Sequence, residues 1–354
     1  MGFAAFPGVG PKKFAALVNA FGSAQQAWQA SENDLRDVLG NALTEKFLAF
    51  RLAFSLEEYL RKLENARIQF ITIDDDAYPE LLKKLPNPPI VLFAKGNISL
   101  LYSPHMIAVV GTRKVTSYGR SVTELLTKQL TEQQVVIVSG LAIGIDSIAH
   151  TTAVNNQGKT IAVLGCGVDC CTPSSNQKVY NEILEKDGLI VSESAFGAAS
   201  SKGMFPSRNR IIAGLSHGVL VTEGAEDSGA LITAKYAKEL DRMVFAVPGH
   251  ITSSLSHGPL KLMQDGAVIV SSTQDILRKL NIDKSTYNKI TTIETNDPVE
   301  RSILSQLTHE DMHFDELVKK IKLDSSHLAG ILSIMELKGY VQVGKEGKYI
   351  FNAK

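Results

Sequence analysis

The sequence predicts an α/β fold, an extended Rossmann-like doubly wound sheet, with a small helical domain before it and a winged helix after it. The first observation is a series of short, β-branched, apolar segments between residues 107 and 270, separated by stretches of helical periodicity. Such segments are typical of parallel strands covered on both faces. The second observation is that glycine-rich turns follow most of these segments. The third is that the strand–helix rhythm is lost towards both ends of the chain.

The composition is that of an ordinary globular protein of two or three domains, with 354 residues, 44% of them hydrophobic. Lys+Arg and Asp+Glu both total 37, so any basic surface for nucleic acid must be local. The three cysteines, Cys166, Cys170 and Cys171, fit no even disulfide framework and no paired zinc pattern. We find neither a membrane-length apolar run nor a secretory signal, and we therefore expect a cytoplasmic protein without a membrane partner.

Residues 1–66 are predicted to form a small helical domain similar to SAM or helix-hairpin-helix domains. Phe6–Lys13 is a glycine hairpin that leads into a helix over Lys12–Phe21, and Ser31 is suited to cap a later helix. In a helix-hairpin-helix, glycine amides reach a DNA phosphate. Contact with DNA and a plain docking role therefore both remain open for this domain.

Residues 67–280 are predicted to form the extended Rossmann-like domain. Two strands, Arg67–Ile73 and Ile90–Phe93, precede the regular alternation, and Asp74–Asp76 is expected to be a solvated turn. The strands of the alternation are predicted at Ile107–Val110, Val135–Ser139, Thr160–Leu164, Leu189–Ser192, Gly218–Thr222, Met243–Ala246 and Ala267–Val270. Right-handed crossovers place the loops after these strands at one edge of the sheet, where doubly wound folds bind ligands.

Residues 281–297 have the composition of a linker, and residues 298–354 are predicted to form a winged helix (DML1-like). The predicted elements are helices at Val299–Gln306 and Phe314–Lys319, a third helix from an Asp324 cap to Lys338, and a terminal hairpin. Winged helices commonly bind duplex DNA through the third helix. Here that helix begins with few cations, so a protein-docking role is favoured over DNA contact.

The loop after the first strand of the alternation is the strongest candidate site. Gly111, Thr112, Arg113 and Lys114 lie between this strand and a helix, where free backbone amides and the helix dipole attract anions. A dinucleotide fold usually keeps small residues there, whereas an arginine can bind a phosphate bidentately. The loop predicts a phosphate site, either for a free nucleotide or for a nucleic-acid chain.

Further loops are expected to meet this one at the same edge of the sheet. The candidate residues are Ser139, Gly140, Gly144 and Asp146 after the second strand, Phe205, Arg208, Asn209 and Arg210 at a helix start, and Ser228, Gly229 and Lys235 in and after a glycine turn. Glycines let a backbone approach a ligand, and the cations would focus positive potential. Asp146 could instead cap its helix, and Arg208 and Arg210 could instead pair with Glu193 and Glu223.

Catalytic patterns are missing from the sequence. Neither Ser139 nor Ser228 lies in a G-x-S-x-G elbow, and there is no H-E-x-x-H zinc motif and no lysine-bearing P-loop. We therefore predict no catalytic residue, no metal and no cofactor. The glycine loops with their cations are better suited to binding consecutive phosphates than to breaking a bond.

Six motifs in order resemble the DNA-processing protein A (DprA/Smf) family over roughly residues 70–275: VVGTRK…YGR, SGLAIGIDSIAH, TIAVLGCGVD, FPSRNRIIAGLS, SGALITA and FAVPGH. The resemblance implies binding and protection of single-stranded DNA, loading of the RecA recombinase in natural transformation (competence), DNA recombination, and a homodimer formed through the Rossmann-like domain. It also implies a basic DNA pocket containing Arg113, Arg208, Arg210 and Lys235.

Two positions depart from the family pattern. Ile143 stands where the family often has an arginine, and Thr172 stands where it usually has a tyrosine. These changes would remove a cation and a stacking platform. The sheet domain is also similar to that of nucleoside-monophosphate phosphoribohydrolases, although Glu223-Gly224 and Pro248–His250 match their loops only in part. A nucleotide-processing enzyme is therefore the alternative.

Overall fold

The computed structural model describes residues 1–199, 204–282, 297–307, 312–321, 323–344 and 347–351. The chain divides into two compact units, Met1–Ile282 and Asp283–Lys354. Most of the predicted linker, 281–297, lies outside the described residues. Within the described ranges, none of the helices is both long enough and apolar enough to cross a lipid bilayer.

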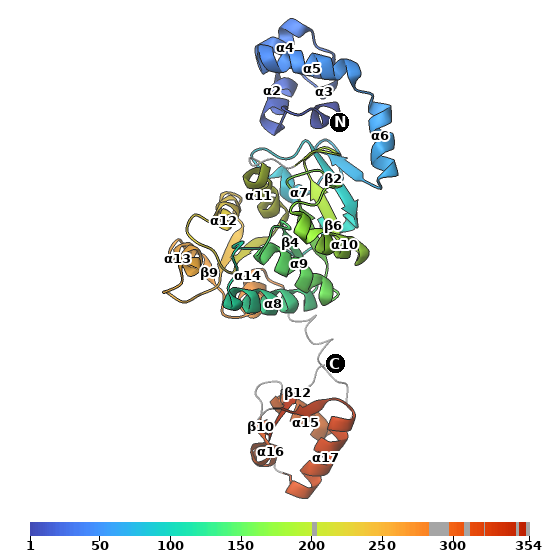
Figure 1. Ribbon diagram of the computed structural model, residues 1–354. Coiled ribbons are helices and arrows are strands. Elements are labelled where there is room, and N and C mark those ends of the chain that lie inside the picture. The colour runs from blue at the N-terminus through green and yellow to red at the C-terminus, as the bar shows by residue number, and fades with distance from the viewer. Residues whose placement is uncertain (200–203, 283–296, 308–311, 322, 345–346, 352–354) are drawn as a thin grey trace. The chain divides into compact units, whose positions relative to one another are not determined.

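Short helices form the N-terminal part of the first unit (Figure 1). They are α1 Gly2–Ala5, α2 Pro11–Phe21, α3 Ala24–Gln29, α4 Glu32–Leu39, α5 Asn41–Ala53 and α6 Leu56–Asn65. Gly22 ends α2 in the left-handed region with φ +82°, and Ser31 caps α4 by accepting a hydrogen bond from the Asp34 amide at 3.3 Å. Stacked Phe3 and Phe47 lie in the buried core of these helices.

A nine-stranded sheet forms the centre of the first unit, in the order β1-β2-β6-β5-β4-β3-β7-β8-β9. β2 runs antiparallel to both of its neighbours, and all other pairs are parallel. The strands are β1 Gln69–Thr72, β2 Val91–Gly96, β3 Met106–Val110, β4 Val136–Ser139, β5 Thr160–Val163, β6 Leu189–Ser192, β7 Gly218–Val221, β8 Met243–Ala246 and β9 Val268–Ile269. The predicted parallel α/β sheet is thus confirmed. The ends of β3 to β9 differ from the prediction by at most one residue, whereas β1 begins two residues later and β2 ends three residues later than predicted.

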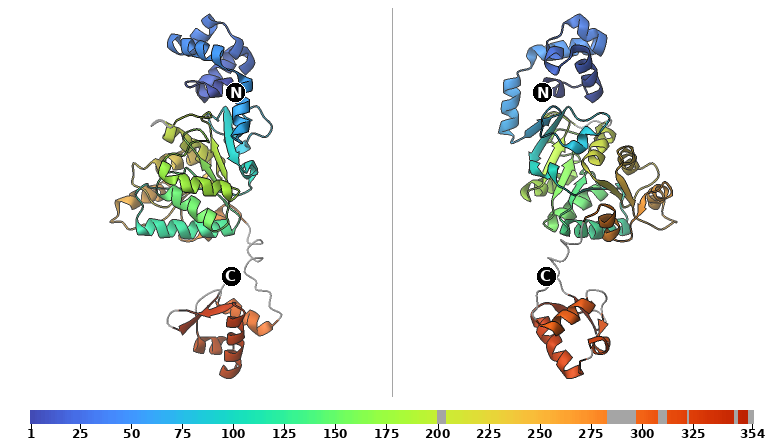
Figure 2. Two further views of the ribbon diagram at one scale, coloured as in Figure 1. Left: turned by 45° about the vertical axis from the view of Figure 1, so that its right-hand side comes forward. Right: turned by 180° about the vertical axis from the view of Figure 1, so that it is seen from behind.

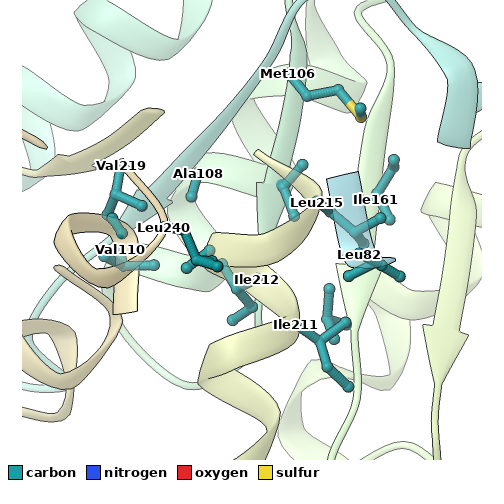
Figure 3. Close-up of a cluster of buried hydrophobic side chains, with 14 of the residues drawn as sticks. Leu82, Met106, Ala108, Val110, Ile161, Ile211, Ile212, Leu215, Val219 and Leu240 are labelled. Carbon is teal, nitrogen blue, oxygen red and sulfur yellow. The ribbon is translucent and has the colours of Figure 1, made fainter. Parts of the chain in front are cut away.

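Helices cover both faces of this sheet (Figures 1 and 2). They are α7 Glu80–Lys83, α8 Ser117–Glu132, α9 Ile145–Asn155, α10 Gln177–Glu185, α11 Met204–Leu215, α12 Gly229–Glu239, α13 His257–Gln264 and α14 Thr273–Lys279, with short 3-10 helices η1 Ile98–Tyr102, η2 Ser174–Asn176 and η3 Ser254–Ser256. On one face, Ile211 and Ile212 of α11 pack with Ala108 and Val110 of β3 (Figure 3). Because side chains alternate along a strand, Ile107 belongs to the other face. Burying each such aliphatic side chain contributes about 1.5–3 kcal/mol.

The second unit is a small domain with its own core. Its elements are α15 Pro298–Leu307, β10 Met312–His313, α16 Phe314–Ile321, α17 Ser325–Leu337, β11 Val341–Val343 and β12 Lys348–Phe351. Asp324 caps α17 by accepting a hydrogen bond from the His327 amide at 3.0 Å, as predicted. β10 completes a three-stranded sheet and was not predicted. Three helices and a β-hairpin confirm the predicted winged-helix architecture.

Candidate functional site

An open pocket of about 600 Å³ lies where the strand order of the sheet reverses, between β3 and β7. β3 pairs with β4 on one side and with β7 on the other, so the chain leaves β3 and β7 in opposite directions across the sheet. Doubly wound folds bind ligands in the crevice at such a switch point. The lining comes from the loops after β3, β4 and β7 and from the starts of α11 and α12, including Gly111, Thr112, Arg113, Lys114, Asp146, Arg208, Asn209, Ser228 and Gly229.

The loop between β3 and α8 is held in place by the buried residue Glu223. The Thr112 amide donates to the Glu223 carbonyl oxygen at 2.7 Å. The Glu223 carboxylate accepts from the backbone nitrogen of Thr116 at 3.0 Å and from its Oγ1 at 2.6 Å. Arg113 and Lys114 lie between these anchors and are exposed at the pocket. A loop fixed at both ends in this way presents its cations at a defined position.

The loop between β4 and α9 packs directly against the first loop. Gly144 has φ +94°, and a Cβ atom there would come within 2.3 Å of the Thr112 carbonyl oxygen. Gly144 is also the N-cap of α9, so Asp146 does not cap this helix. The Asp146 carboxylate instead accepts hydrogen bonds from the amides of Gly140 and Ala142, at 3.2 and 3.4 Å. Burial raises the pKa of Asp146, and the charge of Arg208 opposes this rise.

Ser139, at the end of β4, is fully buried and links β4 to β3 through its side chain. Its Oγ donates to the Val109 carbonyl oxygen at 2.7 Å. The pocket lining does not include Ser139. This predicted site residue therefore supports the loops and does not form the surface of the pocket.

Arg208 forms part of the floor of the pocket. It is only 5% exposed, and its Nη1 donates to the carbonyl oxygens of Gly140 and Val163, which follow or end β4 and β5. Burial lowers the pKa of Arg208; the carboxylate of Asp146 opposes that shift, and the like charge of Arg113 adds to it. Two arginines therefore meet at the pocket, one buried and one exposed.

Arg210 lies on the same helix but does not line the pocket. Its Nη2 contacts the Glu193 carboxylate in a largely buried ion pair. The alternative in which the two arginines pair with Glu193 and Glu223 is thus correct for Arg210 alone. Glu223 accepts hydrogen bonds from Thr116, and Arg208 donates to backbone carbonyl oxygens.

The start of α12 forms the opposite wall. Ser228 caps this helix by accepting from the Ala230 amide at 3.3 Å, and Gly229 is exposed beside it. The Asn209 Nδ2 donates to the Gly229 carbonyl oxygen at 3.1 Å and so ties α11 to α12. The positive end of the α12 dipole faces the same space as Arg113.

Lys235 and Phe205 are the remaining predicted site residues. Lys235 lies outside the lining, with a 78% exposed side chain at 3.9 Å from Glu239. Phe205 lies in α11, and its side chain is outside the described part of the chain.

Two side chains of types that often act in catalysis, His150 and Cys166, are buried. His150 is buried with Nδ1 2.7 Å from Thr160 Oγ1, and burial lowers its pKa to about 3, so it is neutral at physiological pH. Burial raises the pKa of the Cys166 thiol to about 12, which leaves little nucleophilic thiolate. The described residues contain no cluster of side chains able to hold a metal ion.

Comparison with known protein families decides which family the chain is part of. The model of the DNA recombination-mediator protein A family matches residues 69–281. The chain belongs to this family. The DprA winged helix domain model matches residues 291–347, which agrees with the fold of the second unit. As a member of the DNA recombination-mediator protein A family, the chain is a recombination mediator of the DprA/Smf type.

Individual relatives agree with this assignment. DNA processing protein DprA of Bacillus subtilis is 40% identical over 250 residues, which are 69% of this chain and 84% of that protein. The crystal structure of DprA from Streptococcus pneumoniae superposes with a TM-score of 0.68 at 37% identity and covers 79% of this chain and 98% of that one. DNA processing protein A from Helicobacter pylori, which binds single-stranded DNA, gives a TM-score of 0.55 at 32% identity over 60% of this chain and 96% of that one.

Sequence reasoning missed several residues of this DprA-family pocket. Glu223 does not line the pocket but anchors the loop that carries Arg113, and its place two residues after the end of β7 was the signal that could have identified this role. Ile232 and Leu255 line the pocket. Leu255 comes from a segment between β8 and α13 without any clear periodicity, so no sequence signal pointed to it.

Proposed function

We propose that this chain is a non-catalytic mediator that binds single-stranded DNA, shields it and loads the RecA recombinase onto it during natural transformation. The observation that carries the proposal is the meeting of Arg113, Lys114, Arg208 and the start of α12 around one open pocket. Exposed cations and helix amides are the groups that bind nucleic-acid phosphates. The exposed loop residues would contact the phosphates, while Arg208 holds the floor.

A nucleic-acid chain is favoured over a free nucleotide for two reasons. The pocket is open to solvent, so a strand can enter and leave it. The Asp146 carboxylate in the lining is buried and accepts hydrogen bonds from backbone amides, so it is poorly placed as a general acid or base. The relative from Helicobacter pylori, which binds single-stranded DNA, supports the same choice.

The proposal includes a cytoplasmic homodimer formed through the sheet domain. β9 is an edge strand of only two residues, and Ile269 on it is 57% exposed. Unpaired strand edges with apolar side chains are prone to association. For the winged helix we propose protein contact, because α17 has no Lys or Arg between Ser325 and Leu337.

A filter-binding titration of the full chain with oligo-dT of about 4 to about 16 nucleotides tests the proposal. We expect affinity to rise with length, to fall with salt and to depend little on sequence. Failure to bind any oligonucleotide would contradict the proposal. Release of free base from nucleoside monophosphates would instead support the nucleotide-processing alternative.

A further inference from the structure

A second hollow, of about 470 Å³, lies in the groove between α8 and α9. It begins beside the pocket, because both helices start from the loops that line the pocket. Asp146 in the first turn of α9 faces the pocket, and the next residue, Ser147, lines the groove. Ile143, in the loop that leads into α9, is 51% exposed. The groove and the pocket therefore lie next to each other at two consecutive residues of α9, Asp146 and Ser147.

The two walls of the groove differ in chemistry. Residues four apart lie on one face of a helix. On α9, the row Ser147, Thr151 and Asn155 lines the groove with hydroxyl and amide groups. The α8 wall instead carries Arg120, Glu124 and Lys128. Arg120 and Lys128 are separated by about 12 Å along the helix axis. Their side chains are 59% and 56% exposed.

Both cations are accessible to an anionic ligand, although each has a carboxylate partner. Arg120 lies 3.5 Å from Glu124, and Lys128 lies 3.9 Å from Glu132, each pair being exposed to solvent. Exposed ion pairs of this kind contribute little stability. An incoming phosphate therefore competes easily with either carboxylate. Two cations spaced along a groove that leads from a phosphate site favour a nucleic-acid strand over a protein segment.

We propose that the α8–α9 groove carries the single strand onward from the pocket. Arg120 and Lys128 contact its phosphates, and Ile143 packs against a base where the strand crosses between the two hollows. The hydroxyl and amide wall of α9 hydrogen-bonds to sugars and base edges without selecting a sequence. This inference rests on the proposed binding of single-stranded DNA by the pocket.

The test compares short and long oligo-dT, of about 4 and about 16 nucleotides, on the double variant Arg120→Ala/Lys128→Ala. We expect unchanged affinity for the short strand and about tenfold weaker binding of the long one. The slope of log K against log salt should fall by about 1.4, since each single-strand phosphate contact contributes about 0.7. The matched control is Arg61→Ala/Lys62→Ala, which removes two exposed cations from α6, where Arg61 pairs with Glu57 at 2.6 Å.

A variant that should gain affinity distinguishes the loss of a DNA contact from the loss of folded protein, because damage to the fold would not tighten binding. Glu124→Gln removes the carboxylate that lies between the two cations and should tighten binding of the long strand by about threefold. Glu57→Gln on α6 is its control and should change nothing. If the double variant binds both strands as the wild type does, the groove is off the DNA path and the inference fails, while the pocket proposal stands. An equal loss for both lengths without a gain in Glu124→Gln also overturns it. If the wild type binds neither strand, the proposed function fails as well.

Discussion

The buried carboxylate of Glu223 accepts two hydrogen bonds from Thr116, one from the backbone nitrogen at 3.0 Å and one from Oγ1 at 2.6 Å. This contact joins the end of β7 to the start of α8. Together with the bond from the Thr112 amide to the Glu223 carbonyl oxygen, it fixes both ends of the loop that carries Arg113 and Lys114. The position of the exposed cations therefore depends on a carboxylate that lies beneath them.

Replacing Thr116 by Val tests this anchor, because valine keeps the shape of the side chain and lacks the hydroxyl donor. We expect the free energy of unfolding to fall by about 1–3 kcal/mol, since a buried carboxylate loses a hydrogen bond. Urea unfolding measures the change, with the exposed Ser121→Ala as the control. Equal stabilities for Thr116→Val and wild type would show that the Oγ1 bond contributes nothing.

Arg113→Ala should weaken binding of oligo-dT by at least about tenfold at moderate salt, which corresponds to about 1.4 kcal/mol. The reason is the loss of an exposed cation at the pocket. Arg61→Ala removes an exposed arginine of α6 and should bind like the wild type. Wild-type affinity in Arg113→Ala would remove this residue from the proposed DNA site.

Arg208→Ala should lower both stability and DNA affinity. The substitution leaves the carbonyl oxygens of Gly140 and Val163 without a donor and leaves the buried Asp146 without its nearby cation, so we expect a loss of about 3 kcal/mol or more. Arg208→Lys keeps the charge but not the planar, multidentate donor, and it should restore little of that stability. Urea unfolding and filter binding on the same samples measure both effects. Full stability in Arg208→Lys would show that charge alone is sufficient.

Acid should destabilise the sheet domain through His150. Burial, with the charge of Arg208, lowers the pKa of His150 from 6.5 to about 3. Between these two values the unfolded chain binds a proton that the folded chain does not, so stability is present above pH 6.5 and is lost as the pH falls. The contribution reaches at most about 1.4 kcal/mol per pH unit.

The pH effect is measured by urea unfolding at about pH 7 and about pH 5. His150→Gln should reduce the slope of the free energy of unfolding against pH by up to about 1.4 kcal/mol per pH unit. His257→Gln, at an exposed position, should leave this slope unchanged. An identical pH dependence in His150→Gln and wild type would assign the acid sensitivity to other groups.

The central strands β3 to β7 were predictable because each is an apolar, largely β-branched run whose residues are all buried. β10 escaped prediction because its two residues, Met312 and His313, do not form a β-branched apolar run. The location of the pocket was also predictable in outline. Parallel strands bring their carboxyl ends to one edge, and the glycine loops with Arg113 and Lys114 follow those ends.

The roles within the pocket could not be predicted in the same way. Arg208 and Arg210 look equivalent in the sequence, but residues two apart on a helix point about 200° away from each other. One arginine therefore reaches the strand ends, and the other reaches Glu193. Which of the two faces the pocket is set by the rotation of α11, and that rotation is set by the packing of Ile211 and Ile212 on the sheet.

The pairing of β3 with β7, in the register Ile107 with Gly218, has a consequence for the newborn protein. Synthesis proceeds from the N-terminus, so β3 to β6 leave the ribosome long before β7 and α12 do. Until then, the loop with Arg113 has neither Glu223 to anchor it nor the start of α12 to face it. A nascent or prematurely ended chain therefore carries the cations but not the assembled pocket.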